Sequence, residues 1–258
     1  MNRLLRKFTF PPEIIDVIEN CKAILIPVSK HELYDMVFGT GRSGKYDVVY
    51  DVPGQGQVSE ATVIRAKNGV VVNYVEDYMR RRDPDCMRIG DDKPTDKPRF
   101  SDVYGYPFSK MRDETLEWLK TQELIFMPFN SGGNTYGYGS MLICPRNAAF
   151  FAFAMANLQG FISAEECEGF APRAIVYVAP PFRHTHFKGK QVVVHNRLDD
   201  CHEVFSYNLY PGPSAKKGVY SVLLDIGEQE GWVTAHASAA RMTTQYDNEL
   251  GIMHEGAS

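Results

Sequence analysis

The chain has 258 residues, a net charge of −4, 44% hydrophobic residues and 23% charged residues. This composition is typical of a soluble globular protein that is long enough to bury a substantial core. The mildly acidic balance gives no electrostatic reason to expect nucleic acid or an anionic membrane as a partner. No run approaches the roughly 18 apolar residues of a membrane span, and the basic start lacks the apolar stretch of a signal peptide.

Five cysteines are scattered along the sequence, and none forms a C-x-x-C pair: Cys21, Cys86, Cys144, Cys167 and Cys201. Their odd number and wide spacing suggest neither a zinc site nor a disulfide framework. Reduced, mostly buried thiols in a cytoplasmic protein are therefore expected.

The first forty residues predict a helix, a strand and a second helix. Prolines at positions 11 and 12 suit the first turn of a helix, whose apolar side is formed by isoleucines. Residues 23–27 are a compact apolar run, which indicates a buried strand. Residues 29–32, Ser-Lys-His-Glu, form a capping box, so the second helix should begin there and end at Gly39.

Alternating apolar and polar residues predict three strands in the next segment, at residues 46–50, 61–65 and 70–74. Asn68-Gly69, between the last two, is a good signal for a two-residue hairpin. Residues 76–100 carry many charges of both signs and predict a solvated loop. Anion binding by Arg80–Arg82 in this loop is the alternative interpretation.

The second half of the chain begins with strongly apolar patterns. They predict helices at residues 112–120 and 148–158, and strands at 124–127, 174–179 and 191–195. The second of these helices has apolar residues around its circumference, so it should be buried on most faces. Residues 163–166, Ser-Ala-Glu-Glu, form another capping box.

Two histidines, His184 and His186, are separated by one residue in the connection between the last two of these strands. This spacing puts both imidazoles on one side of a strand, which is typical of a metal-binding pair. No third ligand lies nearby in the sequence, so polar loop residues are the preferred interpretation. His195, His202 and His254 have no partner that the sequence identifies.

The last fifty residues contain the motifs that indicate chemistry. A Pro/Gly-rich turn after Tyr210 leads into Lys216-Lys217-Gly218, and apolar residues then recur at helical spacing. We expect a helix from about residue 215 to 226, with Ser214 as its N-cap and Gly227 just after its end.

The segment after this helix predicts two strands. Residues 231–239 form a run that indicates a buried strand and contains His236, and residues 250–254 indicate a second strand after a polar turn. Gly256-Ala257-Ser258 then follow, and a strand that runs into a glycine-led turn is how a phosphate-binding P-loop begins. The other five positions of that motif are not in this sequence.

In this order, the motifs resemble phosphoenolpyruvate carboxykinase, most closely its ATP-dependent branch. That family reads Tyr-x-Gly-Glu-Met-Lys-Lys-Gly, then Met-His-Cys-Ser-Ala-Asn on a strand, then the P-loop Gly-Leu-Ser-Gly-Thr-Gly-Lys-Thr. The likeness covers residues 205–258, and Thr40-Gly41-Arg42-Ser43 matches four of five residues in the family's Thr-Gly-Arg-Ser-Pro. The segment from Tyr210 to the lysine pair is one residue longer than in the family, and Ala237 and Ala240 replace its Cys and Asn.

The resemblance implies an α/β fold with a mixed β-sheet flanked by helices, like the N-terminal domain of the carboxykinases, across residues 1–258. It implies that the nucleotide-binding half follows Ser258. It also implies roles for eight residues: Arg42, Tyr210, Gly212 and Lys216 at the substrate, Lys217 and His236 on Mn²⁺ or Mg²⁺, and Gly256 and Ser258 on the phosphates of ATP or GTP. Lys216, Lys217 and Arg42 are the expected catalytic residues.

The expected function is the substrate-binding half of a carboxykinase-like enzyme, which decarboxylates oxaloacetate or a related acid and transfers a phosphoryl group from a nucleotide. The alternative is a non-catalytic module that binds a small carboxylate or phosphate on the same scaffold. The enzyme interpretation predicts that Arg42 lies near Lys216 and that Lys217 and His236 converge on one metal ion. It further predicts that residues 1–258 alone bind nucleotide weakly or not at all.

Overall fold

The computed structural model describes residues 8–38, 44–75, 86–132, 137–167, 169–235 and 237–255. The chain divides into two compact units, Met1–Tyr220 and Ser221–Ser258, with the boundary inside one helix. Among the described residues, no helix has both the length and the apolar character needed to cross a membrane.

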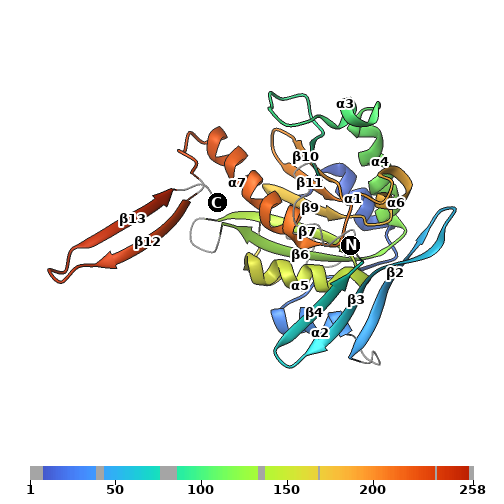
Figure 1. The fold of residues 1–258 in the computed structure, drawn as a ribbon, viewed down its shortest axis with the longest axis horizontal. Helices are drawn as coiled ribbons and strands as arrows, with labels where there is room; N and C mark the ends of the chain where they lie inside the picture. The colour runs from blue at the N-terminus through green and yellow to red at the C-terminus, as the bar shows by residue number, and fades with distance from the viewer. Residues whose placement is uncertain are drawn as a thin grey trace. The chain divides into compact units, whose positions relative to one another are not determined.

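The first unit is built around an eight-stranded mixed sheet (Figure 1). In spatial order its strands are β1 (Ala23–Leu25), β6 (Glu123–Ser131), β7 (Tyr138–Pro145), β9 (Ala174–Val178), β11 (His202–Ser206), β10 (Val193–Arg197) and β5 (Met87–Ile89), and β8 (Gly160–Phe161) pairs with β6. The β6–β7 and β10–β11 pairs are antiparallel, whereas β1–β6, β7–β9, β9–β11 and β10–β5 are parallel. The predicted α/β fold with a mixed sheet flanked by helices is confirmed.

Helices cover both faces of this sheet because its strands are apolar on both sides. On one face, Leu124 and Phe126 of β6 share a core with α1 (Pro12–Asn20) and α4 (Phe108–Lys120). The alternate side chains of β6, Ile125 and Met127, are equally buried and point to the other face. There α5 (Ala149–Leu158) packs against β6 and β7, and α2 (Lys30–Phe38) packs against α5 (Figure 1).

Three short helical segments complete the connections of this unit. They are α3 (Phe100–Tyr104), α6 (Phe182–His186) and the 3₁₀ turn η5 (Ala164–Glu166), while another 3₁₀ turn, η4 (Arg146–Ala148), leads into α5. The predicted capping box at Ser163 and Glu166 is confirmed, because the Glu166 carboxylate accepts from the Ser163 backbone N–H at 2.8 Å. The strand predicted at residues 23–27 is shorter and less buried than expected, because β1 is the edge strand.

A second, three-stranded antiparallel sheet consists of β2 (Lys45–Val52), β3 (Gly56–Ala66) and β4 (Gly69–Tyr74). All three strands were predicted, and the predicted hairpin joins β3 to β4. Its two-residue loop is Lys67-Asn68, one residue earlier than Asn68-Gly69, because Gly69 pairs with Ala66. Ring contacts attach this sheet to the helices of the first: Phe38–Tyr46, Tyr50–Trp118 and Tyr74–Phe150.

The charged segment that follows is only partly the solvated loop that its composition predicts. Arg80–Arg82 lie outside the described residues, but partly buried hydrogen bonds hold β5 and the loop after it. The Asp91 carboxylate accepts from the guanidinium of Arg197 at 2.7 Å, and Arg99 donates to the backbone carbonyl of Lys93 at 2.9 Å. Burial alone would raise the pKa of Asp91, but hydrogen bonds and charge from Arg197 outweigh burial, and the pKa is lowered.

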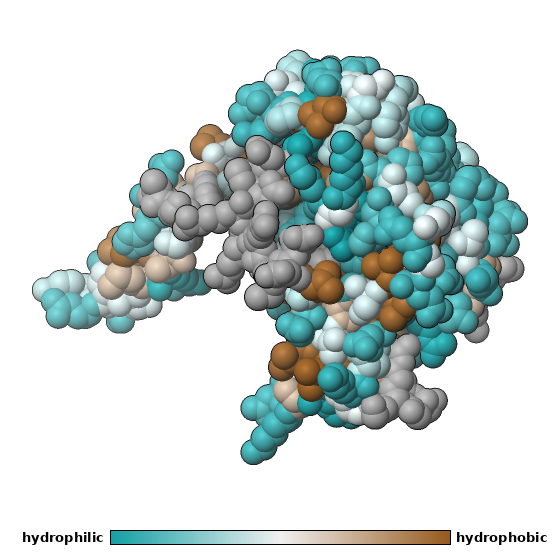
Figure 2. Space-filling view, turned by 45° about the vertical axis from the view of Figure 1, so that its right-hand side comes forward, coloured by the Kyte–Doolittle hydropathy of each residue, from teal (hydrophilic) through white to brown (hydrophobic). Residues whose placement is uncertain are grey.

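The second unit contains most of α7 (Lys217–Gln229) and a hairpin of β12 (Ala237–Thr243) and β13 (Glu249–Glu255). Every residue of β12 is exposed, and Figure 2 shows weakly hydrophobic residues along the middle of the hairpin and hydrophilic residues at its tip. The buried strand predicted at residues 231–239 is therefore wrong. Trp232 is 68% exposed and Val233 is 97% exposed. The prediction failed because the sequence pattern indicates an extended strand but does not show whether another element buries that strand.

The predicted limits of the last helix are also corrected. Helical structure begins before Ser214, which lies inside a turn and is not an N-cap. Gly227 lies within α7, and the left-handed residue after the helix is Gly231, with a φ of 77°. Gly227 is needed for close packing instead, because a Cβ there would lie 2.8 Å from Cγ2 of Thr234.

Candidate functional site

The four predicted site residues that the structure describes lie in one short stretch after β11. Pro211 opens a π-helical turn, η6 (Gly212–Lys216), which continues directly into α7. The backbone N–H of Lys217 donates to the carbonyl oxygen of Gly212, five residues earlier. π-helical turns are rare and are frequently found at functional sites.

The turn presents two lysines while its middle is buried. Ser214 and Ala215 are fully buried, whereas Lys216 and Lys217 are exposed. The Gln159 side chain at the end of α5 donates to the carbonyl oxygen of Ala215 at 3.0 Å. This bond uses a carbonyl that the irregular helical turn leaves available, so α5 holds the turn in place.

The Tyr210 ring packs closely against Gly212. A Cβ at Gly212 would lie 2.7 Å from Cε1 of Tyr210, so only glycine fits beneath this ring. The Tyr210 ring also makes a T-shaped contact with Tyr74 of β4, with 5.5 Å between centroids. Burial, and secondarily the neighbouring Tyr210, raise the pKa of Tyr74, which therefore stays a neutral phenol.

Two fully buried polar side chains in this stretch have no hydrogen-bond partner among the described residues. Both amide atoms of Asn208 and the hydroxyl of Ser214 are unpaired. An unsatisfied buried polar group costs about 1–3 kcal/mol, and native proteins keep few of them. This unused hydrogen-bonding capacity, beside two exposed lysines, makes the stretch from Asn208 to Lys217 the candidate site.

One family model, described as a domain of unknown function (DUF4914), matches residues 10–258. The chain belongs to this family. No match is found among curated proteins. The family description states no activity.

The turn brings together Tyr210, Gly212, Lys216 and Lys217, but the other predicted positions are not placed. Arg42, His236, Gly256 and Ser258 all lie outside the described residues. The expected approach of Arg42 to Lys216, and of His236 to Lys217, stay predictions. Within the described part of this DUF4914 chain, no group of three or more His, Cys, Asp and Glu residues could hold a metal ion.

A buried histidine pair, which the sequence did not reveal, lies close to the start of α7. Nδ1 of His195 is 2.8 Å from Nε2 of His202, and a Cβ at Gly218 would lie 3.8 Å from Cε1 of His195. Burial lowers the pKa of His195, and the nearby His202 and Arg197 lower it further. The pairing follows from the antiparallel register of β10 and β11, and β11 itself was not predicted.

His184 and His186 do not form a pair. They lie on α6, not on a strand or a loop, and contact different elements. His184 contacts the buried carboxylate of Glu60 in β3, and Nε2 of His186 is 3.1 Å from the carboxylate of Glu114 in α4. Both therefore help attach α6 to its neighbours, and the metal interpretation receives no support from their positions.

Proposed function

We propose that this chain is the substrate-binding half of a phosphoenolpyruvate carboxykinase-like enzyme. In the proposed reaction, a C–C bond of oxaloacetate or a related acid breaks and carbon dioxide leaves. The resulting enolate oxygen then attacks the γ-phosphorus of ATP or GTP, and the nucleoside diphosphate leaves. Positioning and charge neutralisation supply most of the catalysis in phosphoryl transfer.

The π-helical turn is the observation that carries this proposal. The carboxykinase motif has one residue fewer between its tyrosine and its lysine pair than this chain has between Tyr210 and Lys216. A π-helical turn closes its hydrogen bond over one residue more than an α-helical turn. The extra residue can thus be absorbed in η6, and Lys217 still begins a regular helix. This supports equating the two lysine pairs despite the different spacing.

The described residues suit the anionic end of such a substrate. Lys216 is exposed and has no ion pair or hydrogen bond among the described residues, so its ammonium is available for a carboxylate or phosphate. Asn208 and Ser214 add unpaired donors in the same stretch. Tyr210, fixed over Gly212, is proposed to bound the substrate site.

The metal part of the proposal rests on two residues. Lys217 and His236 are proposed to hold Mn²⁺ or Mg²⁺, and a lysine can ligate only as a neutral amine. The described residues alone do not fit a divalent ion, since they contain no suitable cluster. Substrate binding is therefore the role that we propose for the described residues.

A non-catalytic module for a small carboxylate or phosphate is the second candidate. It is favoured by the residues that replace the family's motif, because Ala237 and Ala240 stand where the carboxykinases have Cys and Asn. Such a module would use the same lysines and the same buried donors for binding alone.

A turnover assay on the full-length gene product separates the two candidates. Oxaloacetate, Mn²⁺ and ATP, GTP or pyrophosphate should give carbon dioxide and a phosphorylated product. Lys216→Ala and Lys217→Ala should each lower the rate by roughly 10²-fold or more, the usual effect of removing a group that stabilises developing charge. Lys67→Ala, at a hairpin loop, is the matched control and should leave the rate unchanged.

Two other results would decide against the enzyme. Oxaloacetate binding that depends on Lys216, without turnover for any of the three donors, supports the binding module. Activity that survives both lysine substitutions rejects the site for either candidate.

A further inference from the structure

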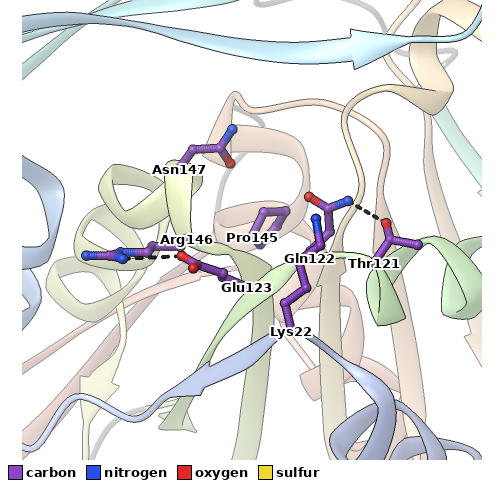
Figure 3. Close-up of a pocket in the computed structure, with 7 residues that line it drawn as sticks. All are labelled: Lys22, Thr121, Gln122, Glu123, Pro145, Arg146 and Asn147. Atoms are coloured by element: carbon purple, nitrogen blue, oxygen red, sulfur yellow. Dashed lines mark hydrogen bonds and ion pairs between the residues drawn. The ribbon is translucent and has the colours of Figure 1, made fainter.

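An open cleft of about 410 Å³ lies at an edge of the main sheet, away from the lysine turn in sequence. It is formed where β7 ends and where β1 and β6 begin, and Figure 3 shows its lining. Six of the lining residues are polar or charged, and the seventh is a proline: Lys22, Thr121, Gln122, Glu123, Arg146, Asn147 and Pro145. Its volume falls within the roughly 300–1,000 Å³ of small-molecule sites.

The cleft contains one available cation. Arg146 is paired with Glu123 at 3.2 Å, and Figure 3 shows this pair directed away from Gln122. Lys22 differs, because its ammonium reaches up beside Pro145 and Gln122 and has no ion pair among the described residues. An anion that enters the cleft would meet this ammonium.

Two amide oxygens supply acceptors that lack a donor. Asn147 donates through Nδ2 to the carbonyl oxygen of Val49 at 3.2 Å, which leaves its Oδ1 buried and unpaired among the described residues. Gln122 donates through Nε2 to the hydroxyl of Thr121 at 2.6 Å, and its side-chain oxygen has no donor in the part of the chain that the structure describes. Figure 3 shows the two amide oxygens turned toward each other across the cleft.

The amide orientations are fixed by these neighbours. Thr121 is itself held, because its hydroxyl donates to the carbonyl oxygen of Trp118 at 2.7 Å. Amide oxygens can only accept, so a molecule between them must donate hydrogen bonds. A bare anion satisfies Lys22 but neither oxygen, and a neutral polyol satisfies the oxygens but not Lys22.

We propose that this cleft binds a small hydroxylated anion. Its phosphate or carboxylate pairs with Lys22, and its hydroxyl groups donate to Oδ1 of Asn147 and Oε1 of Gln122. The inference does not depend on the carboxykinase-like reaction, since it shares no residue with the lysine turn.

The chain carries a natural reporter for a binding experiment. It has two tryptophans, and Trp118 precedes the loop that carries Thr121 and Gln122. In a Trp232→Phe background, fluorescence of Trp118 reports on the cleft. Titration with glycerol 3-phosphate, inorganic phosphate and glycerol should show affinity in that order. Glycerol 3-phosphate should bind about 3–10-fold more tightly than phosphate, as one or two added hydrogen bonds suggest.

Matched variants locate the binding. Lys22→Met should weaken both anions by about tenfold or more, because it removes a charge-assisted contact. Asn147→Ala should weaken glycerol 3-phosphate by about 3–10-fold and leave inorganic phosphate within about twofold. Lys67→Met removes the same charge from an exposed loop and should change nothing.

Three outcomes overturn the proposal. Equal affinity for phosphate and glycerol 3-phosphate would show that the hydroxyl groups make no stabilising contact in the cleft. Unchanged binding by the Lys22→Met variant would place the anion elsewhere. A crystal soaked in glycerol 3-phosphate could show only ordered water between the two amides. This result would mean that water, and not the ligand, donates to the two amide oxygens.

Discussion

The main sheet and the terminal hairpin are both made of short strands, yet they differ completely in burial. All five residues of β9 are buried between parallel neighbours on either side, whereas all seven residues of β12 are exposed and pair with β13. Ala239 and Met253 face each other in the hairpin just as Val176 and Val204 do in the sheet. Local sequence therefore predicts extension in both places, but burial depends on what covers the strand.

The difference should be largest in amide hydrogen exchange. Amides of β9 should exchange at least roughly a thousandfold more slowly than amides of β12, because central strands open only with global unfolding. An isolated two-stranded hairpin is at best marginally stable in water. Exchange measured by NMR or mass spectrometry checks this. Equal protection of the two strands would show that the hairpin is covered in solution.

The second prediction concerns the buried ion pair of the sheet. The carboxylate of Glu203 in β11 accepts two hydrogen bonds from Arg112 in α4, at 2.8 and 2.9 Å, and a third from Asn196 at 2.7 Å. Arg112→Met removes two donors from a carboxylate whose side chain is 2% exposed. The free energy of unfolding of the first unit should fall by about 3–5 kcal/mol, as measured by urea denaturation.

A double variant tests whether the loss comes from the stranded charge. Arg112→Met combined with Glu203→Leu should recover much of the stability, because replacing both partners removes the uncompensated carboxylate. A double variant that is as unstable as the single one would assign the loss to packing of the arginine stem, or to the Asn196 and Tyr177 donors that Glu203→Leu leaves unpaired.

The sequence predicted the parts of the fold that depend on neighbours in the chain. The helix at residues 12–20 follows from its prolines, α5 from its apolar circumference, and the β3–β4 hairpin from Asn68-Gly69. The sequence did not predict structure that depends on a residue far away in the chain. Asp91 orders a charged loop through Arg197, which is 106 residues away, and nothing beside Trp232 in the sequence shows that it is exposed.

The candidate site also contains some residues that the sequence predicted and others that it did not. The lysine pair and Tyr210 were found from their motif, since the motif is continuous in the chain. Asn208 was missed, and Ser214 was assigned a capping role, because their unpaired state exists only in the folded core. The π-helical turn could not be anticipated from helix propensity.

The third prediction concerns the pH dependence of stability that a histidine of the main sheet, His195, produces. Burial, His202 and Arg197 lower the pKa of His195 in the folded protein, while Asp91 opposes them. The unfolded chain, with a histidine pKa of about 6.5, then binds the proton more readily. Stability is therefore complete above about pH 6.5 and is lost as the pH falls from there toward the folded pKa.

The slope of the free energy of unfolding below pH 6.5 should reach at most about 1.4 kcal/mol per pH unit from this group. His195→Asn should flatten the slope and retain a polar partner for His202. His31→Gln is the control, because His31 is exposed on α2 beside Asp35. A slope that His195→Asn leaves unchanged would assign the acid sensitivity to other groups.

The smallest effect is expected from the hairpin's own ion pair. Arg241 and Glu249 contact each other across β12 and β13, and their side chains are 75% and 56% exposed. Both charges remain hydrated, so the pair gains little from its contact, and an exposed pair is worth about 0–1 kcal/mol. Arg241→Gln should therefore change the unfolding midpoint of the first unit by nothing measurable and raise hairpin exchange rates by less than about fivefold. High salt should abolish even that difference, since it screens exposed charges. A loss comparable to that of Arg112→Met would mean that Arg241 is desolvated in solution, and that the contrast between the sheet and the hairpin does not hold there.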